Sequence, residues 1–141
     1  MPLFLSLAII AFAAGFHLLW AVGGRLGYAV SLPQRADGTP VLAHRLAWWR
    51  PAAGGVALCL ALLAALLLVQ AGRLRLPLPA DLVRALLVGA GTAFVARAIL
   101  PNRYVGFFKR LKGTRWARYD SRLYSPLFLA LGLLILWQAR G

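Results

Sequence analysis

Residues 51–72 read PAAGGVALCLALLAALLLVQAG, and none of these 22 side chains is charged. Most of them are Ala, Leu or Val, which are apolar and form helices readily. A helix needs about 20 consecutive apolar residues to cross the hydrocarbon core of a bilayer. The stretch therefore predicts a transmembrane helix, which we place at residues 52–70.

Three further stretches extend this reading over the chain. Residues 1–24 and 123–139 contain no Asp, Glu, Lys or Arg, whereas the uncharged residues 85–96 are bounded by Arg84 and Arg97. A helix rise of 1.5 Å per residue puts these two arginines about 20 Å apart, so each long stem can extend to the edge of a core about 30 Å thick. We predict an all-α polytopic membrane protein, a compact bundle of four transmembrane helices in one domain, residues 1–141, with spans at residues 3–22, 52–70, 80–100 and 124–139.

Composition narrows the functional classes. The chain carries a net charge of +13, yet 62% of its residues are hydrophobic, with a mean hydropathy of +0.76. Such an apolar content excludes a disordered chain, and the single cysteine, Cys59, excludes a disulfide scaffold. The charge alone would suit a nucleic-acid partner, but no recognition motif accompanies it. We therefore expect the lipid bilayer as partner and no nucleic acid.

The positive charges predict the orientation. Eleven Lys or Arg residues lie in the connections at residues 23–50 and 101–122, against three at the opposite ends of the spans. Loops rich in Lys and Arg stay on the cytoplasmic side. We expect a multi-pass protein of the bacterial inner membrane with both termini outside the cytoplasm. Within the first connection, residues 41–50 predict a short interfacial helix with His44 at its surface and Trp48 and Trp49 in the aromatic belt.

The connection between the third and fourth spans is the richest segment. Tyr104, Phe107, Phe108 and Leu111 follow the spacing i, i+3, i+4, i+7, and basic residues fall between them. This pattern predicts a basic amphipathic segment lying in the membrane interface. Each Lys or Arg near an anionic leaflet contributes about 1 kcal/mol to binding. Anionic lipid headgroups are therefore the expected ligands.

Three polar side chains in or beside the spans are notable. His17 and Trp20 share a face of the first helix, just before the glycines at positions 23, 24 and 27. His17 either bonds a neighbouring helix or contacts a ligand, substrate or proton. Asp120 is the one acid in its connection, and we expect it to form a structural ion pair, with Arg97, Arg118 and Arg122 as the candidate partners. In the third span, Gly89 and Ala93 predict close helix packing.

Together these strings resemble a known family. The glycine-rich end of the first span, the run Tyr-Val-Gly-Phe-Phe-Lys-Arg at residues 104–110 and Tyr-Ser-Pro-Leu at residues 124–127 resemble an uncharacterised bacterial family of small four-helix integral membrane proteins. That family is known only as a domain of unknown function. The resemblance implies four spans and no established activity, cofactor or catalytic residue.

We weigh three functions. The favoured one is a non-enzymatic membrane protein that binds an anionic lipid or an amphipathic anion at its cytoplasmic face. A membrane enzyme acting on a lipid or isoprenoid would use His17 as acid/base, assisted by Asp120 or a tyrosine. The third function is that of a small transporter or of a subunit of a membrane complex. The protein partners considered are a second copy of the chain, in a homo-oligomer, or another membrane protein. No motif indicates a metal or cofactor site. The candidate lipid-binding residues are His17, Trp20, Arg97, Arg103, Tyr104, Phe107, Lys109 and Arg110.

Overall fold

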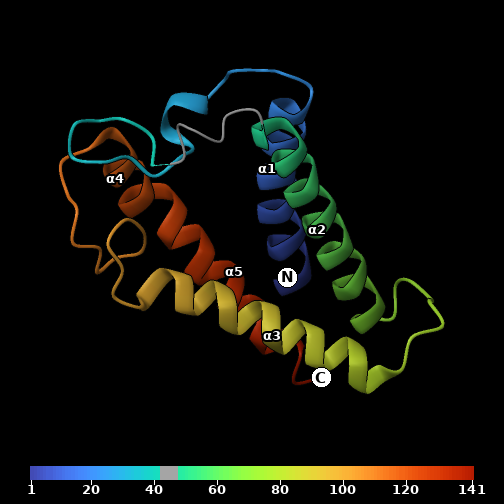
Figure 1. Ribbon diagram of the computed structural model, residues 1–141. Coiled ribbons are helices and arrows are strands. Elements are labelled where there is room, and N and C mark those ends of the chain that lie inside the picture. Colours follow the sequence, from blue (N-terminus) through green and yellow to red (C-terminus); the bar gives the residue numbers. More distant parts are fainter. Residues whose placement is uncertain (42–47) are drawn as a thin grey trace.

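A computed structural model describes residues 1–41 and 48–141 and shows four long helical stretches packed together (Figure 1). They are α1 (Pro2–Ala21), α2 (Trp49–Gln70), α3 (Ala80–Ile99) and a continuous fourth stretch made of α4 (Arg115–Tyr119), the π-helical turn η3 (Asp120–Tyr124) and α5 (Ser125–Gln138). Each of the four is long and apolar enough to cross a membrane. The predicted all-α fold with four candidate membrane spans is confirmed.

The beginning of the fourth helical stretch differs from the prediction. It begins at Arg115, nine residues before the predicted Tyr124, because Thr114 provides an N-cap. The Thr114 hydroxyl accepts a hydrogen bond of 3.0 Å from the Ala117 backbone N–H, which satisfies a donor that the first turn leaves unpaired. The charges of residues 115–122 mark the start of the apolar span, but they do not prevent the helix from extending beyond it.

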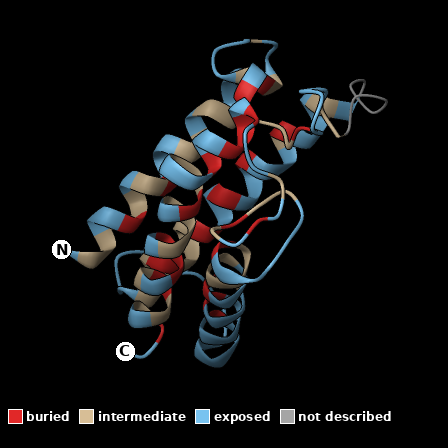
Figure 2. Ribbon diagram, turned by 90° about the vertical axis from the view of Figure 1, so that its left-hand side faces the viewer, coloured by how far each residue is buried: buried red, intermediate tan, exposed pale blue. Residues whose placement is uncertain are grey.

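The helices form two closely packed pairs, α1 with α2 and α3 with α5, which meet in a common apolar core (Figure 1). Leu67, Leu87 and Ile135 are completely buried there, and Ile10 contributes from α1. Large apolar side chains elsewhere on the helices are exposed (Figure 2). In a bilayer these exposed side chains contact acyl chains, so the apolar outer surface is consistent with a multi-pass membrane protein.

Two glycines account for the close approach of α3 and α5. A Cβ atom built on Gly132 would lie 2.8 Å from the Gly91 carbonyl oxygen and 2.9 Å from the Val95 backbone nitrogen. Such contact between backbones is typical of membrane helices, where small residues take the place of a large apolar interface. The predicted packing pair was wrong: Gly89 and Ala93 are exposed, and Gly91 lies on the contact face instead.

A polar contact joins the helices at the end remote from the long connections. The Gln138 side-chain amide donates to the Ser6 hydroxyl at 2.9 Å, and Ser6 is completely buried. The Gln70 amide donates to the Gln138 backbone carbonyl at 3.4 Å. These bonds connect α1, α2 and α5 and satisfy polar groups that would otherwise be buried without partners.

The two long connections lie together at the other end of the helices, and we call their surface the loop face (residues 22–41, 48 and 100–114; Figure 1). Most of the interfacial helix predicted at residues 41–50, including His44, lies outside the described residues. Trp48 is 71% exposed, and Trp49 is the first residue of α2. The Arg50 Nε donates to the Ala21 carbonyl at 3.0 Å and so satisfies the C-terminal end of α1.

Candidate functional site

The segment between α3 and α4 folds back on itself and is not helical. The backbone N–H of Arg110 donates to the Asn102 carbonyl at 3.0 Å, and that of Leu111 donates to the Arg103 carbonyl at 3.0 Å. The helical face suggested by the spacing of Tyr104, Phe107, Phe108 and Leu111 is therefore not formed. Glycines with positive φ at positions 106 and 113 interrupt the segment instead, in a conformation that other residues adopt only with strain.

Gly106 fixes this segment to the end of α3. Its φ is +88°, and a Cβ atom there would lie 2.9 Å from both the Arg97 and the Ala98 carbonyl oxygens. The next backbone N–H, that of Phe107, donates to the Ala98 carbonyl at 2.8 Å. This bond satisfies one of the carbonyls that the last turn of a helix leaves unpaired. Only glycine fits this position without displacing the connection from α3.

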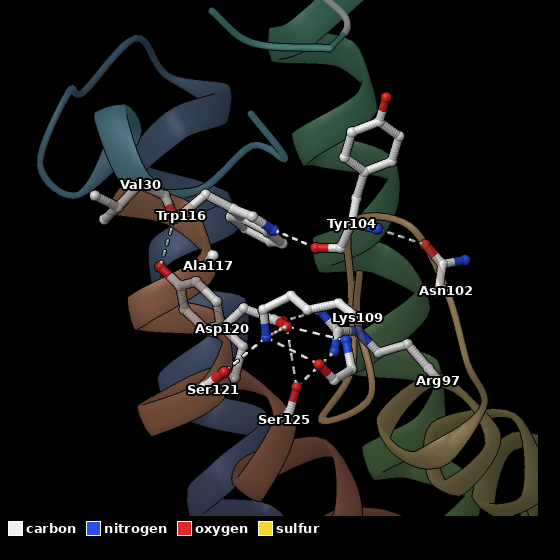
Figure 3. A network of polar contacts seen from close by, with 12 residues as sticks. Val30, Arg97, Asn102, Tyr104, Lys109, Trp116, Ala117, Asp120, Ser121 and Ser125 are labelled. Carbon is white, nitrogen blue, oxygen red and sulfur yellow. Dashed lines mark hydrogen bonds and ion pairs between the residues drawn. The ribbon is translucent and has the colours of Figure 1, made fainter. Parts of the chain in front are cut away.

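The carboxylate of Asp120 is completely buried and lies among Arg97, Lys109 and Ser125 (Figure 3). One of its oxygens accepts a 2.6 Å bond from the Arg97 guanidinium. The other accepts from the Gly106 backbone N–H at 2.9 Å, the Lys109 ammonium at 3.0 Å and the Ser125 hydroxyl at 3.2 Å. The carboxylate thereby joins α3, the α3–α4 connection and the fourth helical stretch at one point.

Of the predicted ion-pair partners of Asp120, Arg97 is the one the structure shows. Lys109 is a second partner that the sequence did not reveal, because it is separated from Asp120 by a non-helical turn. Its ammonium also donates to the Gly106 carbonyl at 2.9 Å and the Ser121 hydroxyl at 2.7 Å, so all three of its donors are used. Two cations and one carboxylate leave this buried cluster with one excess positive charge.

Water reaches the two cations of this cluster to different extents. The Lys109 side chain is only 2% exposed, whereas the Arg97 side chain is 21% exposed. The Arg97 guanidinium also lies over the Phe128 ring, 4.3 Å from its centroid, and donates to the Ser125 hydroxyl at 3.2 Å. Cation–π contact compensates part of the hydration that the guanidinium loses. Arg97 therefore carries the cluster's charge closest to the surface.

Further hydrogen bonds connect both loops to the fourth helical stretch. The Trp116 backbone N–H donates to the Gln34 side-chain oxygen at 3.0 Å, and the Trp116 indole donates to the Tyr104 carbonyl at 2.8 Å. The Tyr124 hydroxyl donates to the Val30 carbonyl at 3.0 Å (Figure 3). Because these bonds join residues far apart in sequence, the loop face is a folded surface whose side chains have fixed neighbours.

Two hollows open on the loop face. The first hollow, of about 370 Å³, is lined by Pro101, Asn102, Arg103, Arg110 and Leu111. The second hollow, of about 450 Å³, is lined by Arg35, Ala36, Asp37, Arg103, Tyr104 and Leu111. Arg103 and Leu111 belong to both, so the hollows adjoin. The first contains two guanidinium groups and no acid, which makes it the loop-face hollow best suited to an anion.

The second hollow differs from the first because its lining includes an acidic residue, Asp37. Its carboxylate accepts from the Thr39 hydroxyl at 2.7 Å and from the Thr39 backbone N–H at 2.9 Å. These hydrogen bonds from Thr39, together with the charge of Arg35, lower the pKa of Asp37 below its usual value. The second hollow therefore contains a charged carboxylate beside its arginines at neutral pH.

The predicted ligand-binding residues fall into three places. Arg103, Arg110 and Tyr104 line the hollows, and Phe107 is half-buried beside them in the same connection. Arg97 and Lys109 belong to the Asp120 cluster. Trp20 and His17 remain on α1, where the buried Trp20 indole donates to the Leu26 carbonyl at 2.7 Å. Arg35 is a lining residue that sequence reasoning missed, because nothing local connects it with a segment 68 residues later.

His17 is positioned by its own helix. Its Nδ1 lies 2.8 Å from the Ala13 carbonyl oxygen, and its ring meets Trp20 edge-on at 5.0 Å between centroids. Within residues 1–41 and 48–141, no hydrogen bond joins His17 to Asp120. In the same described ranges, no group of three His, Cys, Asp or Glu side chains forms a metal site. The contacts of Asp120 are those of a structural carboxylate.

Comparisons with known proteins show a relationship without an activity. Residues 2–135 match the model of a family whose description is Protein of unknown function (DUF3995). No curated protein and no solved structure matches the chain. The resemblance to a family of unknown function, drawn from the first span and residues 104–110 and 124–127, is confirmed over nearly the whole chain.

Proposed function

The chain belongs to the DUF3995 family of proteins of unknown function, and we propose that its loop face binds the headgroups of anionic phospholipids. The proposal treats residues 1–141 as one integral membrane domain without enzymatic activity. The observation that carries it is the first hollow, whose lining in the described part of the chain includes Arg103 and Arg110 and no acidic side chain. Guanidinium groups match phosphate oxygens in geometry and charge.

The surroundings of the first hollow support a position at the level of lipid headgroups. Pro101 follows directly after the end of α3, where Ile99 and Leu100 are 41% and 59% exposed. Phe108, in the same connection, is 64% exposed. Apolar side chains at the end of a span lie against acyl chains, and adjacent arginines reach the phosphate layer. A phospholipid beside α3 would therefore present its phosphate to Arg103 and Arg110.

The Asp120 cluster supports this function indirectly. Arg97 and Lys109, two of the residues predicted to hold the anion, are already bonded to Asp120 and help to fix Gly106. They keep the connection folded, and the backbone bonds between residues 102–103 and 110–111 then hold Arg103 and Arg110 at one hollow. Preorganised side chains bind with less loss of conformational freedom.

A charge-matched comparison tests the proposal. Arg103→Gln with Arg110→Gln removes two positive charges from the loop face, and Arg73→Gln with Arg75→Gln removes two from the exposed α2–α3 connection at the other end. We expect the first double variant to lose most of its co-purified anionic phospholipid, measured by mass spectrometry after gentle detergent extraction. The second should retain it. Equal retention by both variants would contradict the proposal.

The orientation forms part of the proposal. Eleven of the fourteen Lys and Arg residues outside the predicted spans lie in the sequence connections at residues 23–50 and 101–122, which supports placing the loop face on the cytoplasmic side of a bacterial inner membrane. Anionic lipids there give the inner surface a negative potential. We expect a reporter enzyme that functions only outside the cytoplasm to be active when it is fused after Gly141. If a reporter that functions only in the cytoplasm is active at that position instead, the proposed orientation is reversed.

A further inference from the structure

We propose that the lipid bound at the loop face has a phosphate joined to a polyol, as in phosphatidylglycerol, with its phosphate in the first hollow and its hydroxyl groups in the second hollow. This inference rests on the proposed binding of anionic lipid and specifies the headgroup. It follows from the different chemistry of two adjoining hollows that share Arg103 and Leu111.

The second hollow combines groups that suit hydroxyls better than a second phosphate. Asp37 places a carboxylate in its lining, beside Arg35 and Arg103. A carboxylate accepts hydrogen bonds from hydroxyl groups but repels a phosphate, whereas a guanidinium donates to hydroxyl oxygens. A headgroup with two phosphates would bring its second negative charge against Asp37. A headgroup with hydroxyls meets an acceptor and a donor together.

Asp37 has acceptor capacity left for this contact. Within residues 1–41 and 48–141, the hydrogen bonds to Asp37 both come from Thr39 and both go to one carboxylate oxygen. An ionised carboxylate has about four lone-pair sites on two oxygens, so several remain. The Thr39 bonds also hold the side chain in a fixed direction. The Tyr104 side chain, half-buried in the same lining, adds an aromatic surface for the carbon atoms of a polyol.

The order of these features along the surface matches the parts of such a lipid. The exposed Leu100 and Phe108 offer contacts to acyl chains, Arg103 and Arg110 to the phosphate, and Asp37 to the polyol beyond it. Arg103, common to both hollows, lies where the phosphate ester joins the polyol. Phosphatidic acid has the phosphate without the polyol, so it is the comparison ligand that lacks the group assigned to the second hollow.

The test compares these two lipids on three proteins. Detergent-solubilised wild type, Asp37→Asn and Asp81→Asn are titrated with phosphatidylglycerol and with phosphatidic acid, and bound lipid is counted by native mass spectrometry. Asparagine keeps the side-chain oxygen that accepts from Thr39, so the turn at residues 37–39 is preserved. Asp81→Asn removes the same charge from an exposed acid in the first turn of α3, remote from the loop face.

General electrostatics and polyol recognition predict opposite changes in the affinity for phosphatidylglycerol. Removing a negative charge near an anion site should strengthen binding of both lipids, and of phosphatidic acid at least as much. Loss of a charged acceptor for the polyol should instead weaken binding of phosphatidylglycerol and leave binding of phosphatidic acid no weaker than in wild type. We expect Asp37→Asn to lower the affinity for phosphatidylglycerol about three- to tenfold, the range for the net contribution of one hydrogen bond. Asp81→Asn should leave this affinity unchanged.

The outcomes separate this inference from the proposed function. If wild type shows no preference for phosphatidylglycerol, or if Asp37→Asn strengthens binding of both lipids, the polyol assignment is overturned while anionic-lipid binding stands. If wild type binds neither lipid, or if loss of Arg103 and Arg110 changes nothing, both proposals fall. Weaker binding of phosphatidylglycerol by Asp37→Asn, without weaker binding of phosphatidic acid and without the same change in Asp81→Asn, supports the assignment of the second hollow.

Discussion

Replacing Asp120 by asparagine should destabilise the protein far more than any surface substitution of the same kind. Asp120 is completely buried and accepts four hydrogen bonds, two of them from cations. Asparagine has the same shape, but it has no charge and presents an N–H₂ group in place of one oxygen. In one orientation of the amide, this N–H₂ group would face the Arg97 guanidinium, which is also a donor. In the other orientation, it would face the three donors from Gly106, Lys109 and Ser125.

The magnitude follows from the burial of the three charges. Removing one partner of a buried ion pair costs about 3–5 kcal/mol, because the remaining charge stays out of water. In Asp120→Asn two cations remain, but the Arg97 side chain is 21% exposed and stays partly hydrated. We therefore expect a loss near the lower end, about 3 kcal/mol, in the free energy of unfolding. Folded proteins are typically stable by only about 5–15 kcal/mol, so the loss is readily measured.

The assay is unfolding in mixed micelles with increasing dodecyl sulfate, followed by circular dichroism. Asp37→Asn, an exposed site with the same chemical change, serves as the control and should unfold like wild type. Proteolysis adds a local readout: trypsin should cleave Asp120→Asn faster at Arg110 and Lys112, because the connection is no longer held to α3. Equal unfolding free energies for Asp120→Asn and Asp37→Asn would refute the reasoning.

A double variant keeps this test informative if Asp120→Asn folds poorly. Lys109→Met removes the more deeply buried cation, and in combination with Asp120→Asn it returns the cluster to one excess positive charge. We expect the double variant to be more stable than the sum of the two single losses predicts, with a coupling of about 0.5–3 kcal/mol. Additive losses would show that Lys109 and Asp120 do not act together.

The glycines provide two further predictions, each with a matched control. Gly132→Leu should prevent α3 and α5 from packing, because a Cβ atom at this position already lies 2.8 Å from the Gly91 carbonyl oxygen. Gly89→Leu should be tolerated, because a Cβ atom there has no neighbouring atom within 4 Å. Similar melting temperatures for the two variants would contradict this. Gly106→Ala should cost more stability than Gly38→Ala, since both have positive φ (+88° and +83°) but only Gly106 meets backbone atoms at 2.9 Å. Equal losses, near the 1–2 kcal/mol of the left-handed conformation alone, would show that the docking contact is unimportant.

The positions of the four candidate spans were predictable because a helix that crosses a bilayer excludes charge over a fixed length. That requirement leaves uncharged stretches which can be found without any knowledge of packing, and the arginines at positions 84 and 97 did not obscure the third. The packing partner in α3 was not predictable in the same way. Gly89, Ala93 and Gly91 are all small, and which of them faces α5 depends on the rotation of the helix, which an almost uniformly apolar sequence does not specify.

The loop face shows where sequence reasoning ends. Helical spacing at residues 104–111 suggested an amphipathic face, but Gly106 with positive φ and the bonds of Asp120 determine a folded-back loop. An ion pair of Asp120 was predictable because few acids are available in the chain, but the choice of Arg97 over Arg118 and Arg122 was not. Lys109 and Arg35 were not, because the first depends on a turn and the second on contact between two distant loops. Tertiary contacts that override local preference cannot be read from spacing alone.

The most direct measurement is photo-crosslinking with phosphatidylglycerol that carries a photoactivatable headgroup, followed by mapping of the labelled peptides. Headgroup binding at the two hollows predicts that the label concentrates in residues 35–37 and 101–111 and is lost in the Arg103→Gln, Arg110→Gln variant. Label concentrated instead in the basic connection at residues 71–79, or unchanged in that variant, would contradict the proposal that the loop face is the lipid-binding site.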